Sequence, residues 1–364
     1  MRKSITSILV MLLAPLITVR AQTDFNIPFP RPLHDTADTV TMVVIGDVMM
    51  HAAQLEYDCS SFLSGISSKL KGADIAVANA EFTNAGKPYS GYPCFSAPDA
   101  YSEYLAGCCG IDVFLTANNH ILDKGRKGAV RTMAVYDHLT DSLGMQYTGI
   151  SRSTAERRAR NPLILRRHGR TIAIVNFTYG TNSALRDSTP IVEIMDRKTV
   201  RSAIERAKEE NADFIIAMPH WGEEYQLRHS PDQEEWAEWL VSEGVDAIIG
   251  AHPHVVQDTT HIKGVPVIYS MGNAVSNMSA TNTRLGLAVT LLFVSDRSTG
   301  EMKMLEPRLD FTWCSLPGNL TGNYMTIFIK EWTNRRDDWS NVSDYDNMSA
   351  TLERVKRATG IVAE

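Results

Sequence analysis

The sequence predicts a layered α/β fold, and three observations support this prediction. Six short apolar runs rich in valine and isoleucine recur along the chain, and polar residues follow each run directly. Continuous apolar runs of this kind are typical of strands that are covered on both faces. Segments with helical periodicity lie between several runs, and hydrophobic residues make up 44% of the 364 residues. That composition is typical of a globular chain and excludes disordered, collagen-like and multi-span membrane proteins.

The first 21 residues have the pattern of a secretory signal peptide. Met1-Arg2-Lys3 is positively charged, an apolar run follows from Ile5 to Val19, and Val19-Arg20-Ala21 ends with a small residue. The apolar run is shorter than the roughly 20 residues of a membrane-spanning helix. We therefore expect cleavage after residue 21 and export to the periplasm or the cell surface, with an uncleaved anchor as the alternative. Residues 22–39 contain three prolines and are expected to form a linker.

The expected strands follow one another along the chain. The six apolar runs cover residues 41–45, 74–78, 111–115, 213–217, 245–249 and 265–269. Residues 163–167 and 171–178 flank His168-Gly169-Arg170 and are typical of a β-hairpin. Two more strands are expected near 287–294 and 302–311. From the residues alone, we expect one doubly wound sheet.

Three helices have recognisable ends. Residues 125–143 carry apolar side chains at helical spacing and stop at Gly144. Asp196 is placed to cap a helix over residues 197–210. Ser230-Pro231-Asp232-Gln233 has the pattern of a capping box with proline in the first turn.

The main domain is expected to span residues 40–315. Residues 316–364 become polar and are expected to be peripheral, with a helix over 350–359. The formal net charge of −6 argues against nucleic acid as a partner, because phosphate binding needs an excess of lysine and arginine. Seven arginines between Arg152 and Arg170 are most simply a solvated face. On an exported acidic chain, this basic cluster is also able to hold an anionic polymer.

Polar side chains suited to a metal site follow the predicted strands. Side chains from distant parts of a chain meet at the carboxyl ends of strands in layered α/β folds. The candidates are Asp47, Glu81, Asn119, His120, His220, His252 and His254. Carboxylate, amide and imidazole groups together suit divalent ions such as Mn, Fe or Zn. An imidazole that binds no metal is able to move protons, because its pKa lies near neutrality.

Each candidate also has a purely structural explanation. Asp47 belongs to a Gly-Asp turn, and Glu81 is able to cap a loop. Residues 118–120 are able to cap the helix that follows them, and His220 is able to sit in the core. His252-Pro253-His254 is the strongest motif, because the rigid proline separates two imidazoles that point apart. Six such strand endings in one chain favour a shared site.

Six motifs occur in an order that resembles a known family. They are Gly46-Asp47-Val48-Met49, Asn79-Ala80-Glu81, Ala117-Asn118-Asn119-His120-x-x-Asp123-x-Gly125, His220-Trp221-Gly222-x-Glu224-Tyr225, Gly250-x-His252-Pro253-His254-Val255-x-Gln257 and Tyr269-Ser270-x-Gly272-Asn273. Between about residues 40 and 277, the chain resembles the bacterial capsule-synthesis protein CapA family, also called the poly-γ-glutamate synthesis family. This family is similar to calcineurin-like metallophosphatases. The resemblance therefore implies a four-layer α/β/β/α sandwich of metallophosphatase type and revises the single doubly wound sheet.

The resemblance also implies roles for individual residues. The implied ligands of one or two divalent metal ions are Asp47, Glu81, Asn119, His220, His252 and His254. His120 would be the general acid for the leaving group. The residues expected beside this set are His51, Asn118, Asp123, Glu224 and Asn273, although for His51 a place on the polar surface is the favoured interpretation. Two positions depart from the phosphatase pattern: Met49 replaces a histidine, and Ile121 replaces the acidic residue that usually follows the Asn-His pair.

Three functions are compatible with these residues. The family role is that of an exported component of capsule or poly-γ-glutamate production, acting with membrane-bound synthesis proteins and with metal-dependent hydrolysis as its chemistry. The second is an independent periplasmic phosphoesterase acting on a phosphoester substrate. The third is a non-catalytic scaffold that binds an anionic extracellular polymer. Fold alone does not decide among them, because activity belongs to the site.

Overall fold

The computed structural model describes residues 39–184, 188–295 and 302–362. The predicted signal peptide and residues 22–38 of the predicted linker lie outside these ranges. Thr39, the last residue assigned to the linker, already belongs to the first strand. Within the described ranges, none of the helices combines the length and the apolar character needed to cross a membrane.

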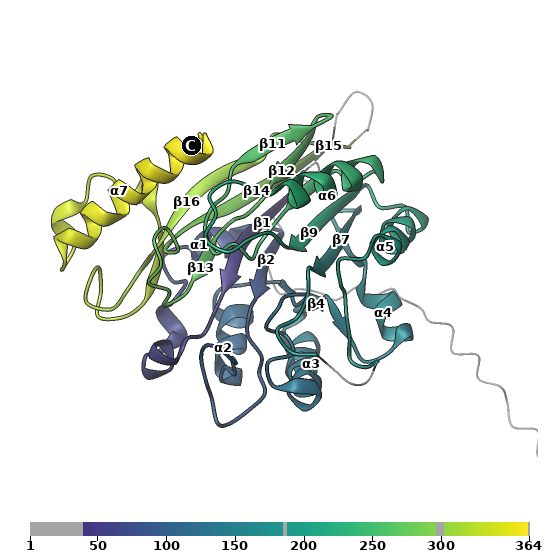
Figure 1. Cartoon of the computed structure of the whole chain (residues 1–364), viewed down its shortest axis with the longest axis horizontal. Coiled ribbons are helices and arrows are strands. Elements are labelled where there is room, and N and C mark those ends of the chain that lie inside the picture. The colour runs from purple at the N-terminus through teal and green to yellow at the C-terminus, as the bar shows by residue number, and fades with distance from the viewer. Residues whose placement is uncertain (1–38, 185–187, 296–301, 363–364) are drawn as a thin grey trace, which may run out of the picture.

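Two β-sheets form the centre of the described structure (Figure 1). The first has the order β17-β16-β14-β1-β2-β3-β4, with β13 beside β1 and β15 beside β14. Its strands are β1 (Thr39–Val48), β2 (Ile75–Ala80), β3 (Val113–Leu115), β4 (Gln146–Thr148), β13 (Asn273–Val275), β14 (Leu285–Ser295), β15 (Met302–Met304), β16 (Arg308–Ser315) and β17 (Met325–Phe328). Strands β1 to β4 are parallel to one another, whereas β14 runs antiparallel to β1.

The second sheet has the order β11-β12-β10-β9-β7-β6. Its strands are β6 (Leu163–Arg167), β7 (Arg170–Thr178), β9 (Phe214–His220), β10 (Ala247–Ile249), β11 (Thr259–Ile262) and β12 (Val265–Ile268). A separate short pair joins β5 (Ile150–Ser151) to β8 (Ile191–Val192). The helices are α1 (Ser67–Gly72), α2 (Asp99–Glu103), α3 (Gly125–Leu143), α4 (Thr154–Arg160), α5 (Arg197–Glu209), α6 (Pro231–Ser242) and α7 (Val342–Thr359).

Three apolar clusters show how the layers pack. Between the sheets, Val44 and Val77 of the first sheet belong to one buried cluster with Ile216 of the second. Helices α1, α2 and α3 cover the outer face of the first sheet, and helices α5 and α6 cover the outer face of the second. The order of layers is therefore helix, sheet, sheet, helix. This confirms the four-layer prediction and shows that the single doubly wound sheet is wrong.

Most of the predicted elements are present. The six apolar runs become β1, β2 and β3 in the first sheet and β9, β10 and β12 in the second. The predicted hairpin is β6 and β7. The side chain of Asp196 accepts a hydrogen bond from the Thr199 amide at the start of α5, and Ser230 and Gln233 form the capping box of α6. Helix α3 ends at Gly144 in the left-handed conformation, φ 74°.

The C-terminal region differs from the prediction in three ways. The strand expected near 302–311 is divided into β15 and β16, and helix α7 begins eight residues earlier than residue 350. The segment 316–364 also supplies the edge strand β17 and buried core residues, including Met348 and Val355 of α7. It lies at one end of the molecule (Figure 1) but contributes to the core between the layers. The polar composition of the segment did not predict this contribution to the core, because only one stripe of α7 is apolar.

Candidate metal site

The candidate residues lie at the ends of strands from both sheets. Asp47 lies at the end of β1, Glu81 directly follows β2, and Asn119 follows β3. His220 ends β9, and His252 follows β10. The structure brings these side chains together at the edge where the two sheets meet.

The backbone around Asp47 is packed too closely for a side chain at the preceding residue. A Cβ atom on Gly46 would lie 1.8 Å from the carbonyl oxygen of Gly272, and the Asp47 amide donates to that same oxygen at 3.0 Å. The Asp47 carboxylate accepts a hydrogen bond from Asn79 Nδ2 at 2.7 Å. Glycine is required here because β1 and the residue before β13 approach each other closely.

Glu81 is completely buried, and neither of its carboxylate oxygens has a hydrogen-bond partner. Its Oε1 atom lies 3.6 Å from His220 Nε2, 3.9 Å from His254 Nε2 and 4.0 Å from His120 Nε2. Burial raises the pKa of Glu81 well above its usual value, and the nearby Asp47 carboxylate raises it further. An unpartnered buried carboxylate is costly for a folded protein. This position therefore needs a ligand or a proton.

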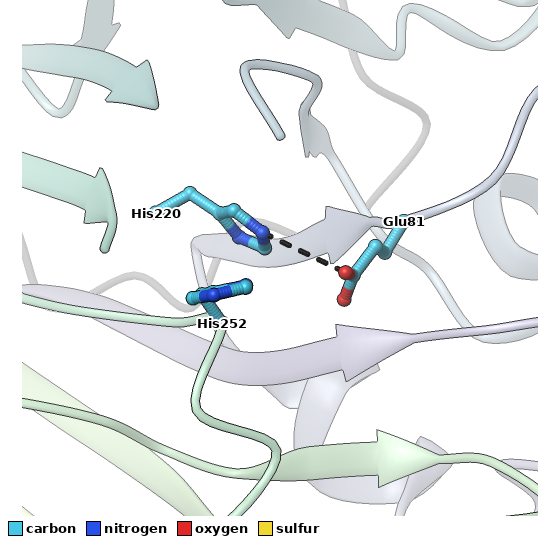
Figure 2. Close-up of side chains that lie close together, drawn as sticks. All are labelled: Glu81, His220 and His252. Carbon is cyan, nitrogen blue, oxygen red and sulfur yellow. Dashed lines mark ion pairs between the residues drawn. The ribbon is translucent and has the colours of Figure 1, made fainter. Parts of the chain in front are cut away.

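His220 and His252 face Glu81 from the second sheet. Figure 2 shows the two imidazoles pointing toward the carboxylate, with the 3.6 Å contact between His220 Nε2 and Glu81 Oε1 as a dashed line. Their ring centres are 4.7 Å apart, and His252 Nδ1 is buried without a hydrogen-bond partner. Burial lowers the pKa of both imidazoles, to about 3 for His252, and neighbouring histidines lower it further. Both rings are therefore neutral at pH 7, the form that binds metal ions.

His254 contacts both carboxylates and is held by Asn273. Its Nδ1 atom lies 2.9 Å from Asn273 Oδ1 and 3.2 Å from Asp47 Oδ2. Burial lowers the pKa of His254, but the charges of Glu81 and Asp47 outweigh burial and raise it to about 9. Without a metal ion, His254 therefore carries a positive charge beside Asp47 and Glu81.

The backbone of the His-Pro-His motif is strained. His252 has φ 101° and His254 has φ 58°, both in the left-handed region that residues other than glycine rarely adopt. Such conformations cost about 1–3 kcal/mol each and persist where the surrounding structure imposes them, often at functional sites. Here the strain directs two imidazoles into one cluster from either side of a proline.

Three groups of donor atoms overlap in this cluster. They are Glu81 with His220 and His252, Asp47 with Glu81 and His254, and Glu224 with His252 and His254. Within each group, the donor atoms lie no more than 4.8 Å apart. Carboxylate oxygens and imidazole nitrogens are the donors that divalent Mn, Fe and Zn accept. The residues present therefore fit a divalent metal, and the unpartnered atoms of Glu81 and His252 are the donors it would use.

His120 lies beside the donor groups and is oriented by a different acid from the expected one. Its Nδ1 atom is 2.8 Å from Asp123 Oδ2, and the ring packs edge-on against Phe95 at 4.6 Å. The Nε2 atom therefore faces Glu81. The departure at Ile121 does not leave His120 without an acidic partner, because the turn after β3 places Asp123 in hydrogen-bonding distance.

Asn118 and Asn119 occupy separate positions in the loop after β3. Asn119 Oδ1 lies 2.9 Å from His220 Nε2, close to the donor groups. The amide group of Asn118 instead donates to the Ala80 carbonyl at 2.9 Å, which fastens the loop to the residue before Glu81.

His51 is not part of any donor group in the described structure. Its Nδ1 atom accepts from the Asn277 amide at 3.2 Å, and its ring packs edge-on against Phe95 at 5.2 Å. It is partly buried rather than a free surface residue, and Phe95 packs against both its ring and the ring of His120. Met49, where the phosphatase pattern has a histidine, lies in the apolar cluster below the site and offers no ligand there.

Three residues near the site were not predicted from the sequence. Asn79 contacts both Asp47 and His220, and it stands in the Asn-Ala-Glu motif, so its position beside Glu81 was the available clue. Asn182 lies 3.4 Å from His120 Nδ1, and the ring of Tyr179 packs on His252 at 4.6 Å. Both belong to the loop after β7, which has no recognisable motif, so only the folded structure reveals them.

Comparison with known proteins agrees with the motifs. The model for the family described as bacterial capsule synthesis protein PGA_cap matches residues 41–278. The chain belongs to this family. This confirms the resemblance identified from the six motifs.

Curated relatives carry names from capsule and polymer biosynthesis. The capsule biosynthesis protein CapA of Bacillus anthracis is 28% identical over 265 residues, which are 69% of this chain and 63% of that protein. The PGA biosynthesis protein CapA of Bacillus subtilis is 32% identical over 174 residues, 47% of this chain and 44% of that protein. The chain thus spans less than two thirds of the length of either relative.

Solved structures with a similar arrangement include two from other bacteria. A novel phosphatase from Mycoplasma pneumoniae has a TM-score of 0.48 and 17% identity, covering 75% of this chain and 93% of that chain. A Staphylococcus aureus structure described as "Putative 5'-Nucleotidase" has a TM-score of 0.48 and 13% identity, covering 74% of this chain and 54% of that chain.

Proposed function

We propose that this protein acts in the production of an anionic extracellular polymer of the capsule type, through a metal-dependent hydrolytic site. Membership of the capsule synthesis family supports the biological role. The overlapping donor groups support one or two divalent ions of the Mn, Fe or Zn class. The substrate class we favour is the polymer itself, a chain with carboxylate groups whose backbone bonds are open to hydrolysis.

One observation carries the chemical part of this proposal. Glu81 is buried with both carboxylate oxygens unpartnered, and it belongs to two of the three donor groups. A site that served only the stability of the fold would pair or protonate such a carboxylate, because an uncompensated buried charge is strongly unfavourable. A divalent ion would satisfy its oxygens and the free nitrogen of His252 together.

The protein's own residues have distinct roles in this proposal. Asp47, Glu81, His220, His252 and His254 would hold the metal, which when bound supplies Lewis acidity and makes coordinated water more acidic. His120 would hold a proton on Nε2 for the leaving group. Asp123 would fix the imidazole in that orientation through Nδ1, as carboxylates do for other catalytic histidines.

Metal analysis combined with an activity assay tests the proposal. The chain from Gln22 would be purified, its metal content measured by mass spectrometry, and hydrolysis assayed on oligo-γ-glutamate and on a simple phosphodiester. We expect bound metal and cleavage of one substrate in the wild type, with His120→Ala keeping the metal but losing activity. Equal activity in the wild type and in His120→Ala would contradict the assigned role. Metal binding without turnover of either substrate would favour a polymer-binding scaffold.

Export is part of the proposal, and the pattern of residues 1–21 supports it. Expression of the full chain in a bacterial host, followed by fractionation, tests it. N-terminal sequencing of the exported material should begin at Gln22. A product that starts at Met1 and stays with the membrane would show a retained anchor instead.

A further inference from the structure

A cavity of about 570 Å³ is lined by residues of helices α4 and α5. Both helices are labelled in Figure 1, at the end of the molecule opposite α7. None of the residues of the candidate metal site lines this cavity. Four of the lining residues are cations, Arg157, Arg158, Lys198 and Arg206. This concentration of positive charge stands on a chain whose formal net charge is −6.

Among the residues that the structure describes, Arg157 is the only one of these four cations that forms an ion pair. Arg157 forms a two-point ion pair with the buried Glu193, with both nitrogen–oxygen distances at 2.7 Å. Arg158 and Lys198 are exposed, and within the part of the chain that the structure describes neither has an ion-pair partner. These two side chains project from different helices, so an anion in the cavity can contact both.

Arg206 is partly buried in the cavity wall and incompletely satisfied. Its guanidinium donates to Ser202 Oγ at 2.8 Å and to the carbonyl oxygen of Asn161, but its buried Nε has no hydrogen-bond partner. Burial lowers the pKa of Arg206, and the neighbouring Arg157 lowers it further. Among the described residues, no carboxylate lies within ion-pair distance of this guanidinium. A bound anion would relieve the repulsion between the arginines.

The cavity also offers hydrogen-bond acceptors. Glu205 and Glu209 line it together with three hydroxyl side chains. Carboxylates in the wall disfavour a dense anion such as inorganic phosphate, but they accept hydrogen bonds from amide N–H groups. A ligand that matches both sets carries carboxylates for the cations and amide N–H groups for the acceptors. The volume is within the range of pockets that enclose ligands larger than a single small ion.

We propose that the cavity between α4 and α5 binds a segment of an acidic polyamide, whose carboxylates contact Arg158, Lys198 and Arg206. This goes beyond the proposed hydrolytic site, because the two places share no residue and the binding requires no metal. The cavity would be a second binding site for the anionic polymer of the proposed function. The basic cluster noted in the sequence thus contains two residues of a defined cavity, Arg157 and Arg158.

Binding of a labelled oligo-γ-glutamate of ten units tests the proposal. Fluorescence anisotropy would be measured with the chain from Gln22, at low and at high salt, with a chelator present. The variant Arg158→Ala/Lys198→Ala removes two unpaired charges without breaking an ion pair and should weaken binding about tenfold or more. The control variant Lys127→Ala/Arg357→Ala removes two exposed charges elsewhere and should stay within about twofold of wild type.

Four outcomes would overturn the proposal. The wild type does not bind the labelled oligo-γ-glutamate, or the two double variants lose equal amounts of affinity. Inorganic phosphate competes as strongly as unlabelled oligo-γ-glutamate, or Glu81→Gln no longer binds. The last would place the polymer at the metal site instead. Unchanged affinity in Glu81→Gln, together with unchanged metal content in Arg158→Ala/Lys198→Ala, would separate this cavity from the hydrolytic site.

Discussion

Replacing Glu81 by glutamine should abolish most of the stabilisation that a divalent metal gives to the folded chain. A ligand at about a thousand times its Kd adds about 4 kcal/mol to the free energy of unfolding. With an unfolding entropy of about 2.1 cal/mol/K per residue, the roughly 320 residues that the structure describes then give a gain of about 6 °C in Tm. Glu81 belongs to two of the three donor groups, so its loss should weaken metal binding about a hundredfold or more. The gain then falls to about 2 °C at the same metal concentration.

Without metal, replacing Glu81 by glutamine should leave the Tm unchanged or raise it at pH 8. The pKa of Glu81 is raised by burial and by Asp47, so the folded state holds this proton more tightly than the unfolded state. The stability linked to this group is therefore full below the unfolded pKa of about 4.5 and decreases as pH rises above it. Glutamine has the same shape and carries no such charge. Metal-free Glu81→Gln should thus equal or exceed the wild type in Tm at pH 8.

Thermal unfolding followed by circular dichroism, with chelator and then with excess Mn²⁺, measures both effects. Glu306→Gln is the matched control, because Glu306 also lies beside a histidine, 3.1 Å from His261 Nε2, but on the surface. It should keep the full metal-dependent gain. A gain in Glu81→Gln as large as in the wild type would refute the assignment of Glu81 as a ligand.

Three further predictions concern other parts of the structure. Asp123→Asn should reduce kcat about 10- to 100-fold and change its pH profile while metal content stays constant, because His120 loses the acid that orients it. Gly46→Ala should lower the free energy of unfolding in urea by about 3 kcal/mol or more, since the added Cβ meets a backbone oxygen. A Cβ atom at Gly72 meets nothing, so the control Gly72→Ala should not destabilise the chain. Burial opposes ionisation of Asp310, but hydrogen bonds from two lysines outweigh burial and lower its pKa below 3.8. Asp310→Asn should therefore lose stability at pH 7, and its difference from wild type should shrink as the pH falls below 3.8.

Each of these predictions has a result that contradicts it. Unchanged kcat in Asp123→Asn would show that His120 needs no acidic partner. Equal urea midpoints for Gly46→Ala and Gly72→Ala would show that β1 has room to move away from the strand beside it. A constant difference between Asp310→Asn and wild type from pH 7 to pH 2 would show that the lysines do not depend on its charge.

Much of the local structure could be predicted from the sequence because its causes are local. Apolar runs, capping residues such as Asp196 and Ser230, and the glycine that ends α3 act within a few residues of one another. The motifs also identified the residues that the structure gathers in the candidate site, and the family match confirms the resemblance. Their roles as ligands remain predictions that the metal experiments test.

The arrangement of strands could not be predicted from the apolar runs themselves. A strand covered on both faces has the same pattern in one doubly wound sheet as in two sheets packed against each other. Only the family resemblance separated these alternatives. The C-terminal helix was predicted, but the polar composition of its segment did not reveal that its apolar stripe packs into the core.

The sequence by itself determined which side chains could bind a metal and at which strand ends they stand. Only the tertiary structure decided that Glu81 is buried without a partner, that Asp123 orients His120, and that Met49 faces the core. It also decided that cations of α4 and α5 surround a cavity. These facts depend on contacts between segments far apart in the chain, which no local pattern of residues encodes.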